Sequence, residues 1–455
     1  MQESHPQAAM PRAAILILSL LFLASSRFDL LYSVHGPPVI TGLASTRADD
    51  VLKAAALILL CVWSMHSLFR HKVLRIEIRS WRSVLFLAYF AWCFLTYFWS
   101  DNSHLTGGRL MVLAATVSVA FAISLRFTTH DLLYLVFSYT LGVNLLGLCA
   151  EISTGAFRPW SSQYRFSGLW HPNTHGLTLA LLVIAGVTLR RRSTQPSKWL
   201  TYGTAFGLVL LLLTRSRTSI ASAIFVVALT SLMLAGARQR VIGVVSLVLV
   251  LLAGAFVGAN GIPLLPQSAV SMGREDGGDA GTLTNRIPLW KDCIPYAKEH
   301  FWGGYGYGGF WNQERIIHIT APEEIAWNPK LLQYVKDGSF LPDAHNMYLE
   351  AWLETGMIGS VLLVALLTTT LLITAGRTLF DRSIDDAFIF SVFLWLCIEG
   401  CLEAITFQPC LPFLICPLLL AKTCIAPEAE TGKLGNAPSQ RPKVSPYMEG
   451  AHAPA

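Results

Sequence analysis

Charged residues are scarce in this chain of 455 residues. They make up 14% of the sequence, whereas hydrophobic residues make up 53% and the mean hydropathy is +0.50. Soluble domains carry about 25% charged residues, so the composition excludes an ordinary soluble domain. Apolar runs that reach or approach the length needed to cross about 30 Å of hydrocarbon recur instead. The sequence therefore predicts an all-α polytopic membrane protein.

Several patterns typical of other protein classes are also missing. No Cys-x-x-Cys metal spacing occurs, and Cys293 is the one cysteine of nine that lies away from the apolar runs. No fixed-period repeat and no inverted duplication of the transporter kind stands out. The glycine-rich run 303–309 lacks the Gly-Lys-Ser/Thr ending of a nucleotide-binding loop. These absences argue against zinc-cluster, repeat and P-loop proteins.

Twelve apolar segments are predicted to be transmembrane helices: 13–33, 51–70, 83–100, 107–125, 131–152, 174–190, 199–214, 217–235, 241–259, 350–375, 385–404 and 408–424. The first is the weakest, because Arg27 and Asp29 interrupt it. Residues 12–26 are alternatively a signal peptide, with a positive charge before the apolar stretch and small residues at its end.

The distribution of positive charge predicts the orientation. With the N-terminus in the cytoplasm, the cytoplasmic segments hold 19 Lys and Arg residues, and the short outer segments with adjoining helix ends hold 8. The positive-inside rule then favours cytoplasmic N- and C-termini and an outward-facing site. The segment 260–343, with 7 Lys or Arg and 10 Asp or Glu residues, faces outward. The pI of about 8.8 thus comes from cytoplasmic loops and does not indicate nucleic-acid binding.

The chain accordingly divides into four parts. Residues 1–259 carry helices one to nine, 260–343 form a large periplasmic loop with short surface helices, 344–425 carry helices ten to twelve, and 426–455 form a disordered cytoplasmic tail.

The large loop contains signals for short helices. A helix start is predicted at Asn285-Arg286-Ile287-Pro288, because proline is tolerated in a first turn, and apolar residues follow at helical spacing from Trp290. A second helix is predicted near 322–336. Asp343 is a candidate N-cap for the next transmembrane helix.

A small set of polar residues recurs at the outer ends of the predicted helices. Arg215 and Arg217 stand in a short turn between two apolar helices. Snorkelling to the headgroups is one explanation. A guanidinium pair also suits a phosphate, and the positive-inside pattern disfavours arginine at this place.

Two further outer segments carry cationic candidates. Arg286 precedes a surface helix, and Arg165 precedes His171-Pro172-Asn173. Alternatively, Arg286 is a solvated charge, Asn173 only caps a helix, and His171 is an interfacial side chain.

His345-Asn346 opens the tenth helix. A lone histidine is more often structural, but an imidazole at the outer rim can take a proton from a sugar hydroxyl at working pH. The positive end of the helix dipole disfavours imidazolium and should keep the ring neutral. Glu350 and Glu354 follow on one helical stripe, where they either orient polar partners or line a wet crevice.

The glycine-rich run has two interpretations. It is either a tightly turned connector or a place where backbone at Gly304 and Gly306 approaches a diphosphate or glycan. In the second case, Tyr305 and Tyr307 would stack on sugar faces.

In this order, the motifs resemble the O-antigen ligase/polymerase superfamily of bacterial envelope biogenesis. The resemblance covers roughly residues 80–425 and rests on Arg165-Phe166-Ser167-Gly168, His171-Pro172-Asn173, Thr214-Arg215-Ser216-Arg217, Arg286 with Trp290, Gly304-Tyr305-Gly306, and His345-Asn346 with its trailing Glu354-Thr355-Gly356-Met357-Ile358-Gly359. The last motif is the most specific.

The resemblance implies a metal-independent, cofactor-free glycosyltransferase of the bacterial inner membrane. The implied partners are an undecaprenyl-diphosphate-linked glycan donor, a glycan or lipid A-core acceptor, the bilayer and other envelope polysaccharide assembly proteins. His345 would be the catalytic base, and Arg215, Arg217, Arg286 and Arg165 would bind the diphosphate. Supporting roles would fall to Asn346, Asn173, Gly304, Gly306, Tyr305 and Glu354.

Members include O-antigen ligases, O-antigen or exopolysaccharide polymerases, and protein O-oligosaccharyltransferases, and the glycine-tyrosine run resembles the exopolysaccharide polymerases slightly more. A transporter or flippase of lipid-linked glycans and a non-catalytic scaffold are alternatives. A transporter should carry charge at midspan on broken helices, whereas 174–190, 199–214 and 241–259 carry none there.

Overall fold

The computed structural model is a helical bundle, and the part of the chain that it describes contains no strand. It describes residues 47–70, 81–162, 164–193, 197–243, 286–319, 343–405 and 411–424. The helices are α3 (Arg47–Arg70), α4 (Trp81–Leu95), the 3₁₀ turn η1 (Thr96–Trp99), α5 (Ser103–Arg126), α6 (Thr129–Thr154), α7 (Pro172–Arg192), α8 (Lys198–Thr214), α9 (Arg217–Leu234), α12 (Arg286–Glu299), α13 (Gln313–Ile319), α16 (Met347–Phe380), α17 (Ile384–Glu399) and α18 (Leu411–Cys424).

Every predicted span that falls on described residues coincides with a helix. Six helical stretches there are long and apolar enough to cross a membrane: Trp81–Trp99, Ser103–Arg126, Thr129–Thr154, Pro172–Arg192, Arg217–Leu234 and Met347–Phe380. The predicted spans 13–33 and most of 241–259, the predicted helix near 322–336 and the tail 426–455 lie outside the described residues. The chain is a multi-pass membrane protein.

One predicted boundary is wrong. The apolar segment 385–404 was expected to be helical throughout, but α17 ends at Glu399 with Gly400 as its C-cap. Residues 401–405 then form a turn, because the peptide groups of Cys401 and Leu402 hydrogen-bond back to Ile398 and Glu399. This early end places Glu403 in the connection to α18 rather than inside a helix.

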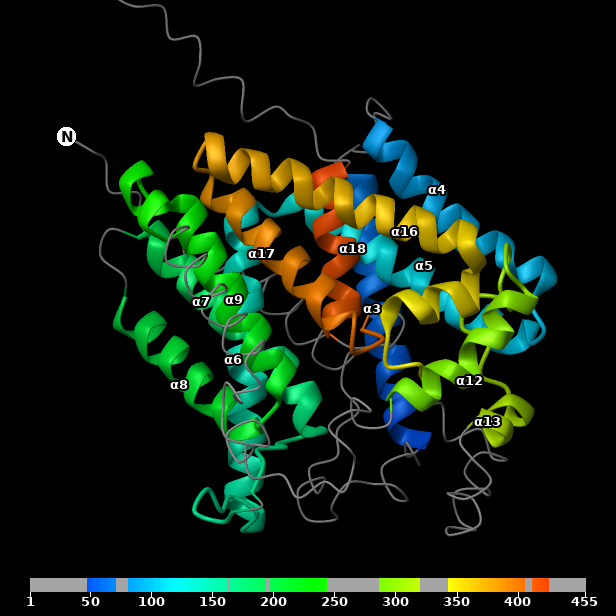
Figure 1. Cartoon of the computed structure of the whole chain (residues 1–455), viewed down its shortest axis with the longest axis horizontal. Helices are drawn as coiled ribbons and strands as arrows, with labels where there is room; N and C mark the ends of the chain where they lie inside the picture. Colours follow the sequence, from blue (N-terminus) through cyan, green and yellow to red (C-terminus); the bar gives the residue numbers. More distant parts are fainter. Residues whose placement is uncertain are drawn as a thin grey trace, which may run out of the picture.

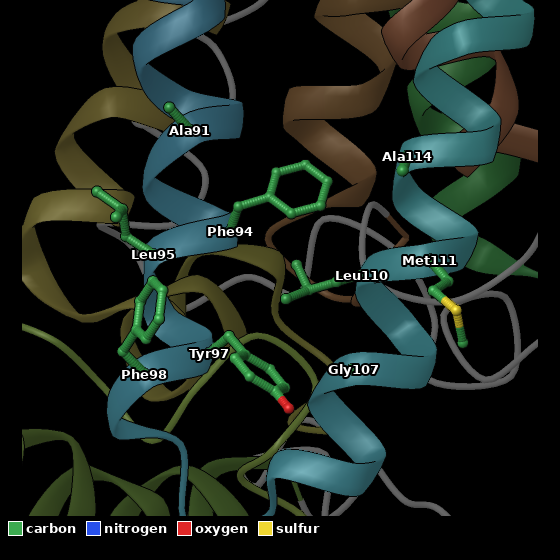
Figure 2. Close-up of a pocket in the computed structure, with 9 residues that line it drawn as sticks. All are labelled: Ala91, Phe94, Leu95, Tyr97, Phe98, Gly107, Leu110, Met111 and Ala114. Carbon is green, nitrogen blue, oxygen red and sulfur yellow. The ribbon is translucent and has the colours of Figure 1, made fainter.

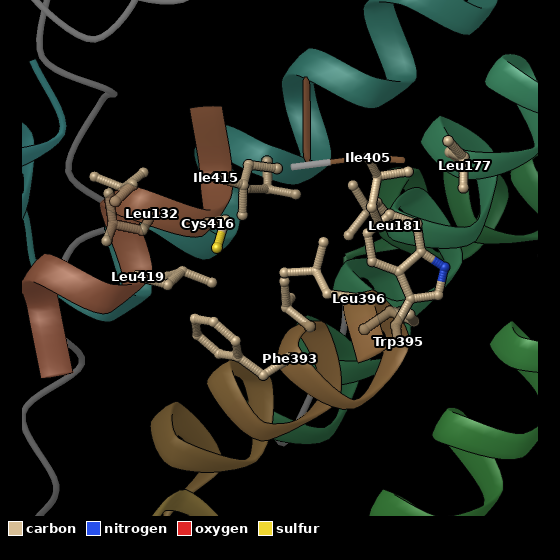
Figure 3. Packing of buried hydrophobic residues seen from close by; sticks show 14 of the residues in the cluster. Leu132, Leu177, Leu181, Phe393, Trp395, Leu396, Ile405, Ile415, Cys416 and Leu419 are labelled. Atoms are coloured by element: carbon tan, nitrogen blue, oxygen red, sulfur yellow. The ribbon is translucent and has the colours of Figure 1, made fainter. Parts of the chain in front are cut away.

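The helices pack around α7 on one side and α16 on the other. α7 contacts α6, α8, α9 and α17, while α16 contacts α17 and α4 (Figure 1). The core lies between α17 and its neighbours, where Phe393 and Leu396 meet Cys416 and Leu419 of α18 (Figure 3). Lipid tails are as apolar as leucine, so tight packing rather than apolarity holds such helices together.

Close approach of α8 to its neighbours depends on glycines. Gly203 and Gly207 lie one turn apart on α8, and a Cβ atom at Gly207 would lie 2.8 Å from Leu182 Cδ2 of α7. A Cβ atom at Gly186 of α7 would overlap the Thr204 hydroxyl. Small residues spaced in this way let helix backbones meet in a membrane.

We expect Gly186→Leu to reduce the amount of folded protein in the membrane. The larger side chain must separate α7 from α8, and overpacking of this kind costs about 1–3 kcal/mol. The measurement is the thermal midpoint of the purified protein together with its membrane level. Gly142→Leu is the matched control, because a Cβ atom at Gly142 meets nothing within 4 Å; equal effects of both substitutions would contradict this account of the packing.

Several basic side chains lie at the end of the bundle where α7 ends. Arg192 pairs with Asp385 at the start of α17, and Lys422 Nζ donates to the carbonyls of Ser124 (3.1 Å) and Phe127 (3.0 Å) near the end of α5. The beginnings of α7, α9 and α16 and the ends of α6, α8 and α17 consequently lie at the opposite end, which carries the residues considered next.

An apolar groove of about 580 Å³ opens between α4 and α5 (Figure 2). It is lined by Ala91, Phe94, Leu95, Tyr97, Phe98, Gly107, Leu110, Met111 and Ala114. None of these side chains is charged, so the lining offers no cation to a phosphate.

Candidate functional site

Glu403 connects three of the motifs that the sequence suggested. Its Oε1 atom lies 2.6 Å from Arg286 Nη2 and accepts from Asn173 Nδ2 at 3.4 Å, and its Oε2 atom lies 3.3 Å from His345 Nδ1. These partners begin α12, lie in the first turn of α7, and precede α16. The side chains of Arg286 and Glu403 are 15% and 19% exposed, so solvent screens this ion pair less than a pair at the open surface.

The network continues from Asn173 to the turn between α8 and α9. Asn173 Oδ1 accepts from Arg165 Nη2 at 3.0 Å, and Arg165 Nε donates to the carbonyl of Thr214 at 3.0 Å. The peptide N–H of Phe166 also donates to Leu213 at 2.9 Å. Residues far apart in sequence thus form one connected polar cluster.

The loop that carries Arg165 is held by a buried carboxylate at the end of α6. Glu151 Oε1 accepts from the peptide N–H groups of Ser167 and Gly168, both at 2.7 Å. His175 Nε2 accepts from Leu169 N–H at 2.9 Å, so its Nδ1 atom carries the proton and donates to Asn144 Oδ1 at 2.8 Å. These contacts explain the Arg-Phe-Ser-Gly motif as the support that aims Arg165 at Asn173.

His345 lies directly before α16 in a left-handed backbone conformation, with φ at 47°. Asp343 Oδ1 accepts its N–H at 2.6 Å and lies 3.2 Å from Nδ1. Asn346, not Asp343 as expected, is the N-cap of α16, because its Oδ1 atom accepts from the N–H groups of Tyr348 and Leu349 at 3.0 Å each. Asn346 Nδ2 also donates to Cys401 at 3.1 Å, which joins the start of α16 to the turn with Glu403.

The surroundings change the expected charge of His345. Partial burial alone lowers the pKa of the imidazole, but the carboxylates of Asp343 and Glu403 raise it by more, so the pKa lies above its usual value. The helix N-terminus was expected to keep the ring neutral. That expectation is wrong, because the two carboxylates favour the protonated ring. The pKa of Glu403 is lowered although burial opposes this, because His345 and Arg286 stabilise the carboxylate.

The geometry assigns different roles to the two ring nitrogens. Carboxylate oxygens accept hydrogen bonds, so Nδ1 facing Asp343 and Glu403 carries a proton, and Nε2 holds the lone pair of the neutral ring. The His345 side chain is 46% exposed. A substrate hydroxyl at Nε2 could transfer its proton there, and Glu403 would stabilise the imidazolium that forms.

The structure separates the predicted arginines into two groups. Arg286 and Arg165 reach Glu403, directly or through Asn173. Arg215 has φ at 52° as the C-cap of α8, and its guanidinium donates to the carbonyl of Ser162. Arg217 is exposed and begins α9. Arg165 nevertheless contacts Thr214, the residue directly before Arg215, so the α8–α9 turn borders the cluster.

The glycine-rich run packs against a break in α16. Gly356 has φ at 69°, and there the N–H groups of Tyr305 and Gly306 donate to Leu353 and Glu354, both at 2.9 Å. A Cβ atom at Gly304 would lie 2.5 Å from Gly356 N. The close backbone approach occurs, but toward α16, which favours the connector interpretation.

Tyr305 offers no free face to a sugar. Its ring is 2% exposed, with the Arg315 guanidinium 3.8 Å from the ring centre and the His300 ring centroid at 4.2 Å. Tyr307 is buried as well. These burials contradict the stacking role suggested for both tyrosines.

Glu350 and Glu354 are buried on the inner face of α16. Glu350 Oε1 accepts from Trp311 Nε1 at 2.7 Å, and Oε2 accepts from Ala344 N–H at 2.8 Å, so Glu350 orients polar partners. Within the described structure both oxygens of Glu354 lack a hydrogen bond. Glu354 therefore has no described bond to the His345 cluster.

The sequence interpretation missed Glu403. The available signal was a pair of carboxylates, Glu399 and Glu403, inside a segment taken as an apolar span, because ionisable residues at such places mark functional sites by default. Glu399 accepts from Ser222 at 2.6 Å and links α17 to α9. Among the described residues, no group of three or more His, Cys, Asp or Glu side chains could hold a metal ion.

Comparison with known proteins bears on this arrangement. Residues 202–364 match the family model described as O-Antigen ligase. The resemblance to the O-antigen ligase/polymerase superfamily is confirmed. The chain is also 28% identical over 152 residues to the exopolysaccharide production protein ExoQ of Rhizobium meliloti (strain 1021). That alignment covers 33% of each chain, so it spans a third of the relative's length.

The O-antigen ligase segment and the polar cluster overlap in part. The segment contains the α8–α9 turn, Arg286 and His345. Arg165, Asn173 and Glu403 lie outside it. The packing of α7 and α17 against α9 and α16 brings them to it, and Arg165 and Glu403 contact its residues directly.

Proposed function

We propose that the protein transfers a glycan from an undecaprenyl-diphosphate-linked donor to a sugar hydroxyl in envelope polysaccharide biosynthesis. The observation that carries this proposal is the His345–Glu403–Arg286 cluster, in which a half-exposed histidine with its Nδ1 atom on a carboxylate lies beside a guanidinium. A proton acceptor and an anion-binding group at one place are what this reaction needs.

The proposed reaction is a single displacement. The acceptor oxygen attacks the anomeric carbon and forms the new glycosidic bond while the bond from that carbon to the diphosphate oxygen breaks. The diphosphate leaves with the electron pair, and the hydroxyl proton passes to His345 Nε2. Attack in one step inverts the configuration at the anomeric carbon.

The arginines would hold the leaving diphosphate. Arg286 and Arg165 lie in the cluster, and Arg215 and Arg217 lie on the adjoining turn. Guanidinium groups stay charged at any working pH and offer paired donors to phosphate oxygens. Their fixed charges would stabilise the charge that grows on the leaving group, which divalent metals do in other transferases.

We place this cluster at the periplasmic face of the inner membrane, with both termini cytoplasmic. The support is the separation of charge in the fold: Arg192, Arg126 and Lys422 lie at the end opposite His345, and positive residues favour the cytoplasmic side.

Within the superfamily we favour an exopolysaccharide polymerase over a lipid A-core ligase. The similarity to an exopolysaccharide production protein supports this choice, as does the glycine-tyrosine run.

The direct test is transfer by the purified protein in lipid nanodiscs. With a polyprenyl-diphosphate-linked oligosaccharide and a glycan acceptor, we expect product at an unchanged rate in excess EDTA, because arginines rather than a metal hold the diphosphate. Product is measured by mass spectrometry. Loss of activity in EDTA with recovery on adding Mg²⁺ or Mn²⁺ would contradict the role given to the arginines, and no product with either metal would contradict the proposed transfer.

A further inference from the structure

Both backbone polar groups of Ala344, the residue before His345, are bound by buried or half-buried side chains. Its N–H donates to Glu350 Oε2 at 2.8 Å, and its carbonyl accepts from Trp290 Nε1 at 2.8 Å. Ala344 is 0% exposed, so water cannot replace either partner. Side chains from two helices, α12 and α16, therefore clamp the peptide that leads into His345.

The clamp holds a backbone that is otherwise unfavourable. A non-glycine residue at positive φ is strained and persists only where its surroundings enforce it. His345 has φ at 47°, and its N–H is bound by Asp343. The two hydrogen bonds of Ala344 fix the residue between Asp343 and His345 in the same turn.

α12 contacts Glu403 and the peptide that precedes His345. Arg286 and Trp290 are four residues apart in α12, so they lie on one face of the helix. Arg286 binds Glu403, and Trp290 binds the peptide before His345. One rigid helix turn thus relates the position of the carboxylate to that of the imidazole.

Glu350 extends the clamp to the segment that follows the glycine-rich run. Its second oxygen accepts from Trp311 Nε1 at 2.7 Å. A buried carboxylate is costly unless its acceptors are satisfied, and here two N–H donors satisfy them.

We propose that Trp290 and Glu350 are positioning residues that hold His345 against Glu403 through Ala344. This inference rests on the proposed function, because it assigns the clamp to the same reaction. It makes turnover depend on two side chains that bind the backbone of Ala344 and, in the case of Glu350, also Trp311, rather than substrate.

Trp290→Phe tests the clamp, since it removes the N–H donor and keeps the ring system's apolar contacts in part. We expect turnover per folded molecule to fall about tenfold with an unchanged KM for the donor. The acidic limb of the pH–rate profile should move to lower pH, because the imidazole would separate from the two carboxylates. Trp352→Phe is the matched control: Trp352 Nε1 donates to the Phe301 carbonyl at 3.3 Å, away from His345, and both properties should stay at wild-type values.

Two further variants test the clamp independently of Trp290→Phe alone. Glu350→Gln keeps an acceptor for one of its two N–H donors, so it should lower turnover in the same direction. In a Glu403→Gln background, Trp290→Phe should shift the acidic limb by less than it does in the wild type, because the part of its effect that passes through Glu403 is already lost and only the part through Asp343 remains.

A Trp290→Phe protein that matches Trp352→Phe in turnover and in pH profile would overturn the clamp, provided that His345→Ala is inactive. If His345→Ala itself transfers glycan at the wild-type rate, the role of His345 as the base fails instead, and if the wild-type protein forms no product, the proposed transfer fails.

Discussion

His345→Ala should reduce glycan transfer by about 10²–10⁴-fold, the range for losing a general base. Glu403 binds the ring at Nδ1, so Nε2 is the atom that would take the acceptor proton. Binding of the donor should stay near the wild-type value, because the arginines remain. Initial rates and donor affinity of purified protein in nanodiscs measure both.

His318→Ala is the control for this substitution. His318 Nδ1 is 3.1 Å from the Tyr296 hydroxyl in the segment α12–α13 and lies outside the Glu403 cluster, so turnover per molecule should be unchanged. A His345→Ala protein that transfers at the wild-type rate, or whose defect disappears once the amount of folded protein is corrected for, would remove His345 from the mechanism.

Glu403→Gln should lower turnover by about 10–150-fold, which corresponds to ~1.5–3 kcal/mol for a hydrogen bond to a charged group. The substitution keeps the side-chain shape but removes the charge that pairs with Arg286 and stabilises the His345 imidazolium. The pH dependence carries a second expectation. His345 acts as a base only when neutral, and its carboxylate neighbours raise its pKa, so the wild-type rate should rise with pH through a value above 6.5.

Without the Glu403 charge the pKa of His345 should fall, so the acidic limb should move to lower pH while the maximum rate decreases. Rates from pH 5 to 9 measure both. Glu299→Gln is the control, because Glu299 accepts from the Tyr305 hydroxyl at 3.0 Å in another part of the protein. An acidic limb that stays in place in Glu403→Gln would show that this carboxylate does not act on the catalytic histidine.

The sequence predicted the start of α12 at Arg286 and helices for the apolar spans that the structure describes. These features are local: apolar runs of sufficient length must satisfy their own backbone in a bilayer, and they do so as helices. The end of α17 was missed because residues after Glu399 stay apolar enough to extend the pattern, while a C-cap at Gly400 stops the helix.

The role of the glycine-rich run could be recognised only from the fold. Absence of Cβ atoms at Gly304 and Gly306 indicates that something comes close, but a sequence does not say what. In the structure the close partner is the broken turn of α16 at Gly356, and the tyrosines between the glycines are buried rather than presented to a sugar.

Hydropathy and short motifs were thus enough to find a membrane protein, its helices, the histidine that opens α16 and the resemblance to a superfamily of glycan transferases. Which charges act together emerged only from the packing of the helices. Glu403 meets Arg286 and His345 across 117 and 58 residues of sequence, because the end of α17 lies against the start of α16 and beside α12. Such a contact depends on how whole helices dock, and no pattern of neighbouring residues encodes it. The same docking adds the charge of Glu403 to that of the neighbouring Asp343, and together the two carboxylates raise the pKa of His345, where the local helix dipole alone would lower it.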